Sequence, residues 1–117
     1  MTRIEWLREA GDSRMVLRAR GHSGAGAYGQ DIVCAAVSVA MELLDANLTV
    51  FGARRGVWKE SGVYELVGEG YTAYKLMSTT AAYLRALAYQ YPENLNFTEK
   101  ILQNRIEWGE NGKSAGI

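Results

Sequence analysis

The fold is decided first by the stretch T-R-I-E-W-L-R-E-A-G-D-S-R-M-V-L-R-A-R, residues 2–20. From Thr2 to Glu9 apolar and charged side chains alternate, which is the period of a strand with one buried face. Residues 10–13 carry the turn signal Ala-Gly-Asp-Ser, and the alternation resumes from Arg14 to Arg20. The sequence therefore predicts that the chain opens with a β-hairpin.

A helix and a second hairpin are predicted next. Apolar residues recur at helical spacing over residues 32–51, with Asp31 as the expected N-cap and Gly52 as the expected stop. Residues 57–60 and 63–67 then flank a Ser-Gly turn, which predicts two further strands.

The last part of the predicted fold is a helix followed by a strand. Helical spacing runs from about Thr72 to Tyr91, and Pro92 ends it. Residues 95–101 are interpreted as a short strand; the alternative is a helix capped by Thr98 that continues to Trp108. The predicted order is β-β-α-β-β-α-β, an α+β sandwich with two helices packed on a mainly antiparallel sheet. Residues 1–108 are expected to form one domain and residues 109–117 a flexible tail.

Composition limits the class of protein. The chain has 117 residues, 48% of them hydrophobic, which suffices for one hydrophobic core. Thirteen basic residues balance thirteen acidic ones, which argues against nucleic acid as a direct partner. One Cys allows no internal disulfide, and one His makes a zinc site of the usual ligands close to excluded. No metal or other cofactor is expected.

The ends and the apolar runs of the chain indicate where the protein works. Charged residues interrupt the N-terminus, which leaves no apolar signal-peptide core. The longest mostly apolar run, Ile32 to Met41, is about half of what a membrane span requires. We therefore expect a cytoplasmic protein without a membrane partner.

Candidate functional residues gather around one loop. Four glycines fall within nine residues, and the only His lies at the start of this loop while the only Cys follows its end. These residues are Gly21, Gly24, Gly26, Gly29, His22 and Cys34. With Cys34 expected in the first helical turn, free N–H groups and the macrodipole would favour its thiolate. An imidazole could take the thiol proton, and the same N–H groups could receive an oxyanion.

Other interpretations of the same residues stay open. A single Cys in an apolar helix is often a small core residue, and Asp31 can be an N-cap without a chemical role. Ser38, one turn beyond Cys34, can bond a carbonyl of the preceding turn or lie near the thiolate. Residues 24–29 match the GxGxxG pattern of nucleotide-binding loops, but a parallel βαβ unit is not predicted. A redox-sensor role for Cys34 would have no second Cys to resolve it.

The run G-H-S-G-A-G-A-Y-G-Q-D-I-V-C-A-A-V-S, residues 21–38, resembles the signature of the bacterial ribosomal-processing cysteine proteases, the Prp family. That pattern is Gly-His, a glycine-containing loop, Gly-x-Asp-Ile-Val-Cys-Ala and a Ser four residues after the Cys. The resemblance covers about residues 1–101. Ser23 stands where the family commonly has Ala, and the segment after Ile101 extends beyond the usual end.

The resemblance implies a cysteine endopeptidase that removes a short N-terminal extension from the precursor of large-subunit ribosomal protein number twenty-seven, in support of ribosome assembly. It implies that Cys34 is the nucleophile and His22 the general base, with Asp31 and Ser38 as supporting residues. The glycine loop would close over an extended peptide whose end is apolar and aromatic. The resemblance also implies a homodimer. The alternative function is a non-catalytic assembly factor that binds a ribosomal protein or the ribosome.

Overall fold

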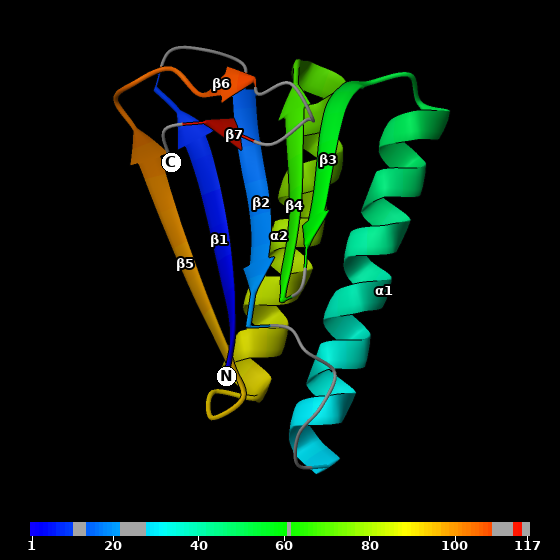
Figure 1. The fold of residues 1–117 in the computed structure, drawn as a ribbon, viewed down its shortest axis with the longest axis vertical. Helices are drawn as coiled ribbons and strands as arrows, with labels where there is room; N and C mark the ends of the chain where they lie inside the picture. The colour runs from blue at the N-terminus through cyan, green and yellow to red at the C-terminus, as the bar shows by residue number, and fades with distance from the viewer. Residues whose placement is uncertain (11–13, 22–27, 61, 109–113, 116–117) are drawn as a thin grey trace.

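The structure, a computed structural model, describes residues 1–10, 14–21, 28–60, 62–108 and 114–115; within residues 28–31, 108 and 114–115 it describes the backbone only. The elements follow one another in the order predicted, and two short strands come after them (Figure 1). They are β1 (Thr2–Glu9), β2 (Arg14–Arg20), α1 (Tyr28–Val50), β3 (Arg54–Glu60), β4 (Val63–Glu69), α2 (Tyr71–Gln90), β5 (Leu95–Leu102), β6 (Glu107–Trp108) and β7 (Ser114–Ala115).

Strands β1 to β5 form one mixed sheet in the order β3-β4-β2-β1-β5. The β1–β2, β2–β4 and β3–β4 pairs are antiparallel, whereas β1 and β5 run parallel. The predicted α+β class with a mainly antiparallel sheet is therefore confirmed. Residues 95–102 form a strand, so the alternative helix beginning at Thr98 is wrong; backbone pairing with β1 holds this segment extended.

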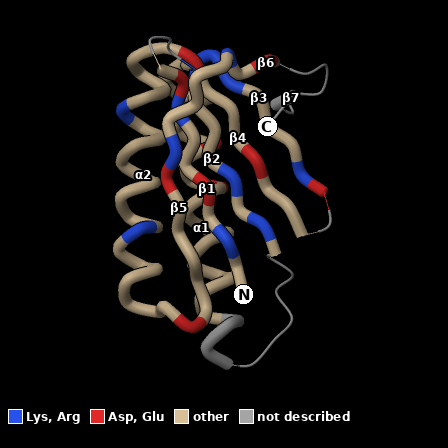
Figure 2. The backbone as a smooth tube through the Cα atoms, turned by 90° about the vertical axis from the view of Figure 1, so that its left-hand side faces the viewer, with Lys and Arg blue, Asp and Glu red and all other residues tan. Residues whose placement is uncertain are grey.

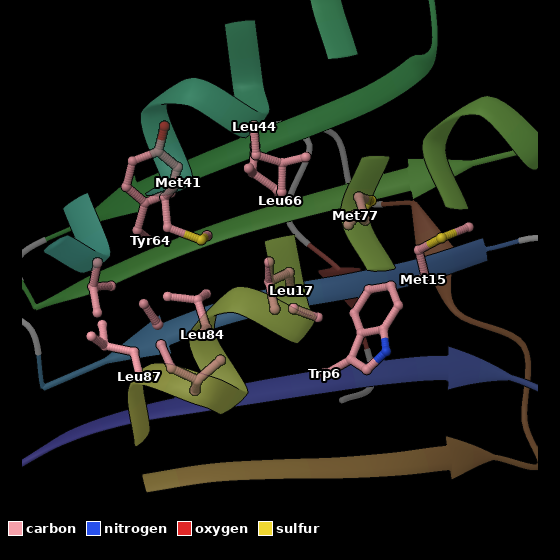
Figure 3. Close-up of a cluster of buried hydrophobic side chains, with 14 of the residues drawn as sticks. Trp6, Met15, Leu17, Met41, Leu44, Tyr64, Leu66, Met77, Leu84 and Leu87 are labelled. Carbon is pink, nitrogen blue, oxygen red and sulfur yellow. The ribbon is translucent and has the colours of Figure 1, made fainter. Parts of the chain in front are cut away.

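The main core lies between the two helices and one face of the sheet (Figure 3). Strand alternation directs Ile4 and Trp6 of β1 and Leu17 of β2 into it, where they are buried with side chains of both helices. Gly68 of β4 permits close packing, because a Cβ at this position would collide with the Met77 sulfur of α2. Burial of this face is what fixes both helices on the sheet.

Helix α1 is apolar over most of its length. Residues Ile32–Val50 have a mean hydropathy of 1.6 over 19 residues, so by length and composition alone this helix could cross a membrane. Its inner face supplies core residues, namely Val33, Val37, Met41, Leu44 and Leu48. The apolar residues of the inner face of α1 therefore belong to the core, and part of the outer face of this helix is apolar as well.

The face of the sheet opposite α2 is partly covered by the C-terminal segment, which includes β6 and β7 (Figures 1 and 2). Ile106 is fully buried there against a row of three strand residues, Leu7, Val16 and Val67. Strands β6 and β7 pair antiparallel, so Ser114–Ala115, within the predicted flexible tail, has a defined backbone partner. Neither short strand was predicted.

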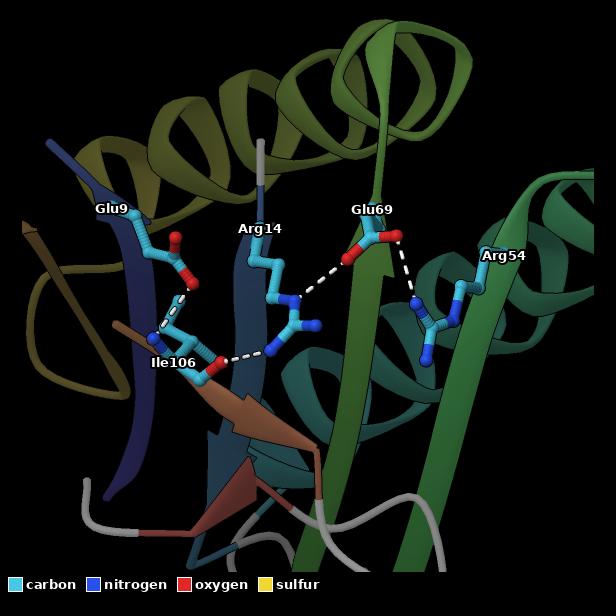
Figure 4. A network of polar contacts seen from close by, with 5 residues as sticks. All are labelled: Glu9, Arg14, Arg54, Glu69 and Ile106. Atoms are coloured by element: carbon cyan, nitrogen blue, oxygen red, sulfur yellow. Dashed lines mark hydrogen bonds and ion pairs between the residues drawn. The ribbon is translucent and has the colours of Figure 1, made fainter. Parts of the chain in front are cut away.

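The backbone N–H and the carbonyl of Ile106 each form a hydrogen bond with a charged side chain (Figure 4). Its N–H donates to Glu9 Oε1 at 2.6 Å, and its carbonyl accepts from Arg14 Nη1 at 2.7 Å. Arg14 Nε and Arg54 Nη1 also donate to the Glu69 carboxylate, at 2.7 and 2.9 Å. These hydrogen bonds, from Arg14 first and Arg54 second, lower the pKa of Glu69 below its ordinary value of 4.5. The network thus joins β1, β2, β3 and β4 to the C-terminal segment.

Candidate active site

Cys34 lies on the inner side of α1 and faces the first residue of β1. Its side chain is buried, with 3% of the residue exposed, and its Sγ lies 3.6 Å from Thr2 Oγ1. Thr2 is the first residue of β1 and is fully buried. Because strand residues alternate between faces, Thr2 shares the helix-facing side of β1 with Ile4 and Trp6. The strand therefore aims a hydroxyl at the thiol.

The backbone of Thr2 is held by the start of β5. Its N–H donates to the Asn94 carbonyl at 3.0 Å, and Thr2 is paired with Leu95 in the parallel ladder. Asn94 and Leu95 are in turn tied to the end of α2, since both of their N–H groups donate to the Tyr91 carbonyl. Two other elements thus determine where the Thr2 hydroxyl lies.

Gly21, the residue that precedes His22 in the sequence, lies at the same end of the sheet. It has a positive φ of 72°, and its N–H donates to the Gly62 carbonyl at 2.9 Å. A Cβ on Gly21 would approach the Met1 carbonyl oxygen to 2.7 Å and the Thr2 Cα to 4.0 Å. Only glycine fits this backbone, and the structure brings Gly21, Thr2 and Cys34 together.

The remaining predicted site residues are placed in part. His22, Gly24 and Gly26 lie outside the described residues. Gly29 and Asp31 are described by their backbone alone, as residues of α1. Ser38 is half-buried on α1, one turn beyond Cys34. Of the predicted site residues whose side chains the structure describes, it is therefore Cys34 that contacts Thr2.

The prediction that Asp31 is the N-cap of the helix is wrong, because α1 begins at Tyr28 and Asp31 is its fourth residue. An acidic residue is favourable both as an N-cap and inside the first turn, so local sequence preference does not distinguish the two positions. Cys34 follows Tyr28 by six residues and lies in the second turn rather than the first. Its own N–H is beyond the four N-terminal groups that lack an intrahelical acceptor. The predicted oxyanion hole of first-turn N–H groups is thus displaced from the thiol.

A groove of about 480 Å³ runs between the outer sides of the two helices. Small and apolar residues of α1 and α2 line it, including Ala36, Val39, Leu43 and Tyr83. Val39 lies five residues after Cys34, which turns it about 140° around the helix from the thiol. Within the described part of the chain, no three His, Cys, Asp or Glu side chains gather closely enough to hold a metal ion. The groove and the thiol therefore lie on different sides of α1.

Thr2 is the residue of this site that sequence reasoning missed. The alternation of β1 placed it on the buried face, but nothing local indicated that this face would meet Cys34, 32 residues later. The sequence signal that could have indicated Thr2 is its polarity, because it is a polar residue on the same strand face as the apolar Ile4 and Trp6. A buried hydroxyl requires a hydrogen-bond partner.

Comparison with known proteins identifies relatives of this chain. A family model described as cysteine protease Prp matches residues 1–96. The structure is similar to that of the essential ribosomal processing protease Prp from Staphylococcus aureus in complex with a substrate peptide. That likeness has a TM-score of 0.72 at 20% identity and covers 86% of this chain and 100% of the other. The same protease with a covalently linked product peptide gives a TM-score of 0.71 at the same identity and coverage.

A third solved structure, that of SMU.848 from Streptococcus mutans, is 26% identical to this chain. It has a TM-score of 0.65 and covers 89% of this chain and 96% of the other. The comparison with curated proteins found no match.

Proposed function

Because this chain belongs to the cysteine protease Prp family, we propose that it removes the short N-terminal extension from the precursor of large-subunit ribosomal protein number twenty-seven. The proposal is supported by the match over residues 1–96 and by the description of the similar Staphylococcus aureus protein as a ribosomal processing protease. The observation that carries it is the contact of Cys34 with Thr2, whose backbone also lies next to Gly21, the residue that precedes His22.

In the proposed mechanism Cys34 Sγ attacks the scissile carbonyl after its proton passes to the His22 imidazole. The tetrahedral intermediate collapses, the C–N bond breaks and His22 returns the proton to the leaving amine. Water, deprotonated by His22, then hydrolyses the thioester and releases the thiol. Asp31 and Ser38 are assigned supporting roles, and the loop of Gly21, Gly24, Gly26 and Gly29 closes over the extended peptide. Because Cys34 is 3% exposed, residues around it must move before a peptide reaches Sγ.

The direct test is cleavage of a synthetic peptide that spans the precursor extension, followed by mass spectrometry. Cys34→Ser and His22→Ala are expected to lose activity by several orders of magnitude, because groups that act as a unit fail together. Ser78→Ala, at a half-buried position on α2 outside the proposed site, serves as the matched control and keeps wild-type activity. Equal cleavage by the wild type and by Cys34→Ala would overturn the proposal. Binding of the peptide without cleavage would favour the non-catalytic assembly factor.

We further propose that the protein acts as a homodimer in the cytoplasm, without direct contact to nucleic acid. The outer face of α1 supports a second copy as the partner of this helix. Apolar residues recur there at intervals of three and four, which is the spacing of a helix–helix seam, and they are Ile32, Ala36, Val39, Leu43, Ala46 and Val50. The balanced charge of the chain supports a partner other than nucleic acid.

The dimer is tested by light scattering of the purified protein, which is expected to give twice the chain mass. Val39→Glu together with Leu43→Glu should reduce this to the monomer mass, since two carboxylates would then be buried in the seam. Tyr89→Glu, on an exposed position of α2, should leave the dimer intact. A monomer mass for the wild type at micromolar concentration contradicts this proposal.

A further inference from the structure

The contact between Thr2 and Cys34 has a chemical consequence beyond packing. At the helix-facing side of β1, a valine would fill the same volume as Thr2 without a hydroxyl that needs a partner. The hydroxyl is instead fully buried with its Oγ1 at 3.6 Å from Sγ, a distance suited to a hydrogen bond with sulfur. Either atom can donate, because a hydroxyl is both donor and acceptor and a thiol is a weak donor.

The position of Cys34 in α1 makes such a donor useful. The thiol lies in the second helical turn, whereas the macrodipole and the free N–H groups act mainly within the first turn. Burial at 3% exposure disfavours a charged sulfur. A hydrogen bond to the charged form opposes this penalty, and Thr2 provides a hydroxyl at the required distance.

Thr2 is also held firmly enough to orient the sulfur. Its backbone is bonded to Asn94 at the start of β5, and Gly21 packs against the adjacent Met1 carbonyl. β-Branched side chains have restricted χ1 angles, which limits the directions that the hydroxyl can take relative to the strand. Both partners of the contact are therefore placed by regular elements, β1 and α1.

We propose that Thr2 is a positioning residue for the Cys34 nucleophile. In the resting state its hydroxyl oxygen accepts a hydrogen bond from the neutral thiol, and once the thiol is ionised its O–H donates a hydrogen bond to the sulfur. This inference rests on the proposed function, because it assigns Thr2 a part in the same reaction. It extends that function to a residue outside the glycine loop and the helix that carry the family signature.

The test replaces the hydroxyl while it keeps the shape. Cys34 is the only Cys in the chain, so ¹³C labelling of cysteine Cβ gives one signal whose chemical shift follows thiol ionisation. Thr2→Val is expected to move the midpoint of this titration upward by about one pH unit, a roughly tenfold loss of thiolate below the midpoint. Thr2→Ser, which keeps the hydroxyl, is expected to restore the wild-type midpoint.

Thr98→Val is the matched control, because Thr98 donates to the Ile4 carbonyl on the neighbouring strand and does not belong to the site. It should leave the midpoint unchanged even where it lowers the melting temperature. If Thr2→Val fails to fold, the Thr2→Ala and Thr2→Ser pair provides the same contrast. Where the peptide is cleaved, Thr2→Val should lower kcat with little change in KM.

Identical midpoints for wild type, Thr2→Val and Thr2→Ser would overturn the role of Thr2. This outcome is separate from failure of the proposed function, because the titration requires no substrate. A shifted midpoint in a protein that cleaves no peptide would leave Thr2 as a partner of the thiol and remove only the protease assignment.

Discussion

At the scale of single residues, sequence spacing identified the nucleophile candidate but not its surroundings. Cys34 and His22 stood out because each is the only residue of its type and both flank the glycine loop. Thr2 could not be found in this way, because its contact with Cys34 joins segments that meet only in the folded sheet. Asp31 is the fourth residue of α1 and not its N-cap, and the sequence could not distinguish these positions because an acidic side chain is favourable at both.

Gly21 offers a prediction at this scale. Gly21→Ala must accept a positive φ and also a Cβ at 2.7 Å from the Met1 carbonyl oxygen. Gly52→Ala is the matched control, because Gly52 has a similar φ of 67° but open space around the Cβ position. We expect Gly52→Ala to cost about 1–2 kcal/mol of unfolding free energy, the strain of a left-handed non-glycine residue. Gly21→Ala should cost about 1–3 kcal/mol more, as in other overpacked sites.

Urea denaturation measures both free energies. Equal losses for the two variants would show that the close approach to Met1 has no energetic weight. Because Gly21 is next to Thr2, its substitution should also reduce peptide cleavage more than that of Gly52.

At the scale of elements, local patterns predicted the strands and helices well. The bounds of β1 and β2 agree with the alternation of residues 2–9 and 14–20, because alternation depends only on neighbours in the chain. The parallel pairing of β5 with β1 was not predicted, since it joins residues about ninety positions apart. Strands β6 and β7 escaped prediction because two-residue strands carry no periodicity.

Glu69 at the end of β4 provides the second prediction, on pH dependence. Its pKa is lowered by hydrogen bonds from Arg14 and Arg54, so the folded state favours the ionised carboxylate. This stabilisation is present above the ordinary value of 4.5 and is lost as the pH falls through the lowered folded pKa. Unfolding free energy measured in urea should therefore decrease on acidification. Glu69→Gln should flatten the part of the decrease that belongs to this network.

The control for this experiment is Glu93→Gln, in the exposed turn after α2. The curve of that variant should keep the slope of the wild type below pH 5. If Glu69→Gln and the wild type gave parallel curves throughout, the Arg14–Glu69–Arg54 contacts would have no role in acid stability.

At the scale of the whole molecule, residues beyond the family match cover part of the second face of the sheet. The family model ends at residue 96, whereas Ile106 is fully buried against Leu7, Val16 and Val67. The C-terminal segment thus packs on the folded domain through Ile106. Hydrogen bonds of its backbone with Glu9 and Arg14 fix its position. Composition alone could not indicate this, because the segment is short and mostly polar.

Ile106 provides the third prediction. Ile106→Ala should lower the unfolding free energy by about 2–4 kcal/mol, because it leaves a cavity beneath the C-terminal segment. Ile101→Ala, at a β5 position that is 53% exposed, should change it by less than about 0.5 kcal/mol. Thermal or urea unfolding distinguishes the two. Similar values for both variants would mean that Ile106 contributes no core packing in solution.

The parallel pairing of β1 with β5 also determines when the site can form during synthesis. Strand β1 leaves the ribosome before β5, yet the carbonyl that anchors Thr2 belongs to Asn94. The hydroxyl beside Cys34 therefore gains its final place only after Asn94 has been made. Such a long-range closing step slows folding. A nascent chain stalled before Asn94 would contain Cys34 but lack the backbone contact that holds Thr2, so the site is expected to form only after translation has passed Asn94.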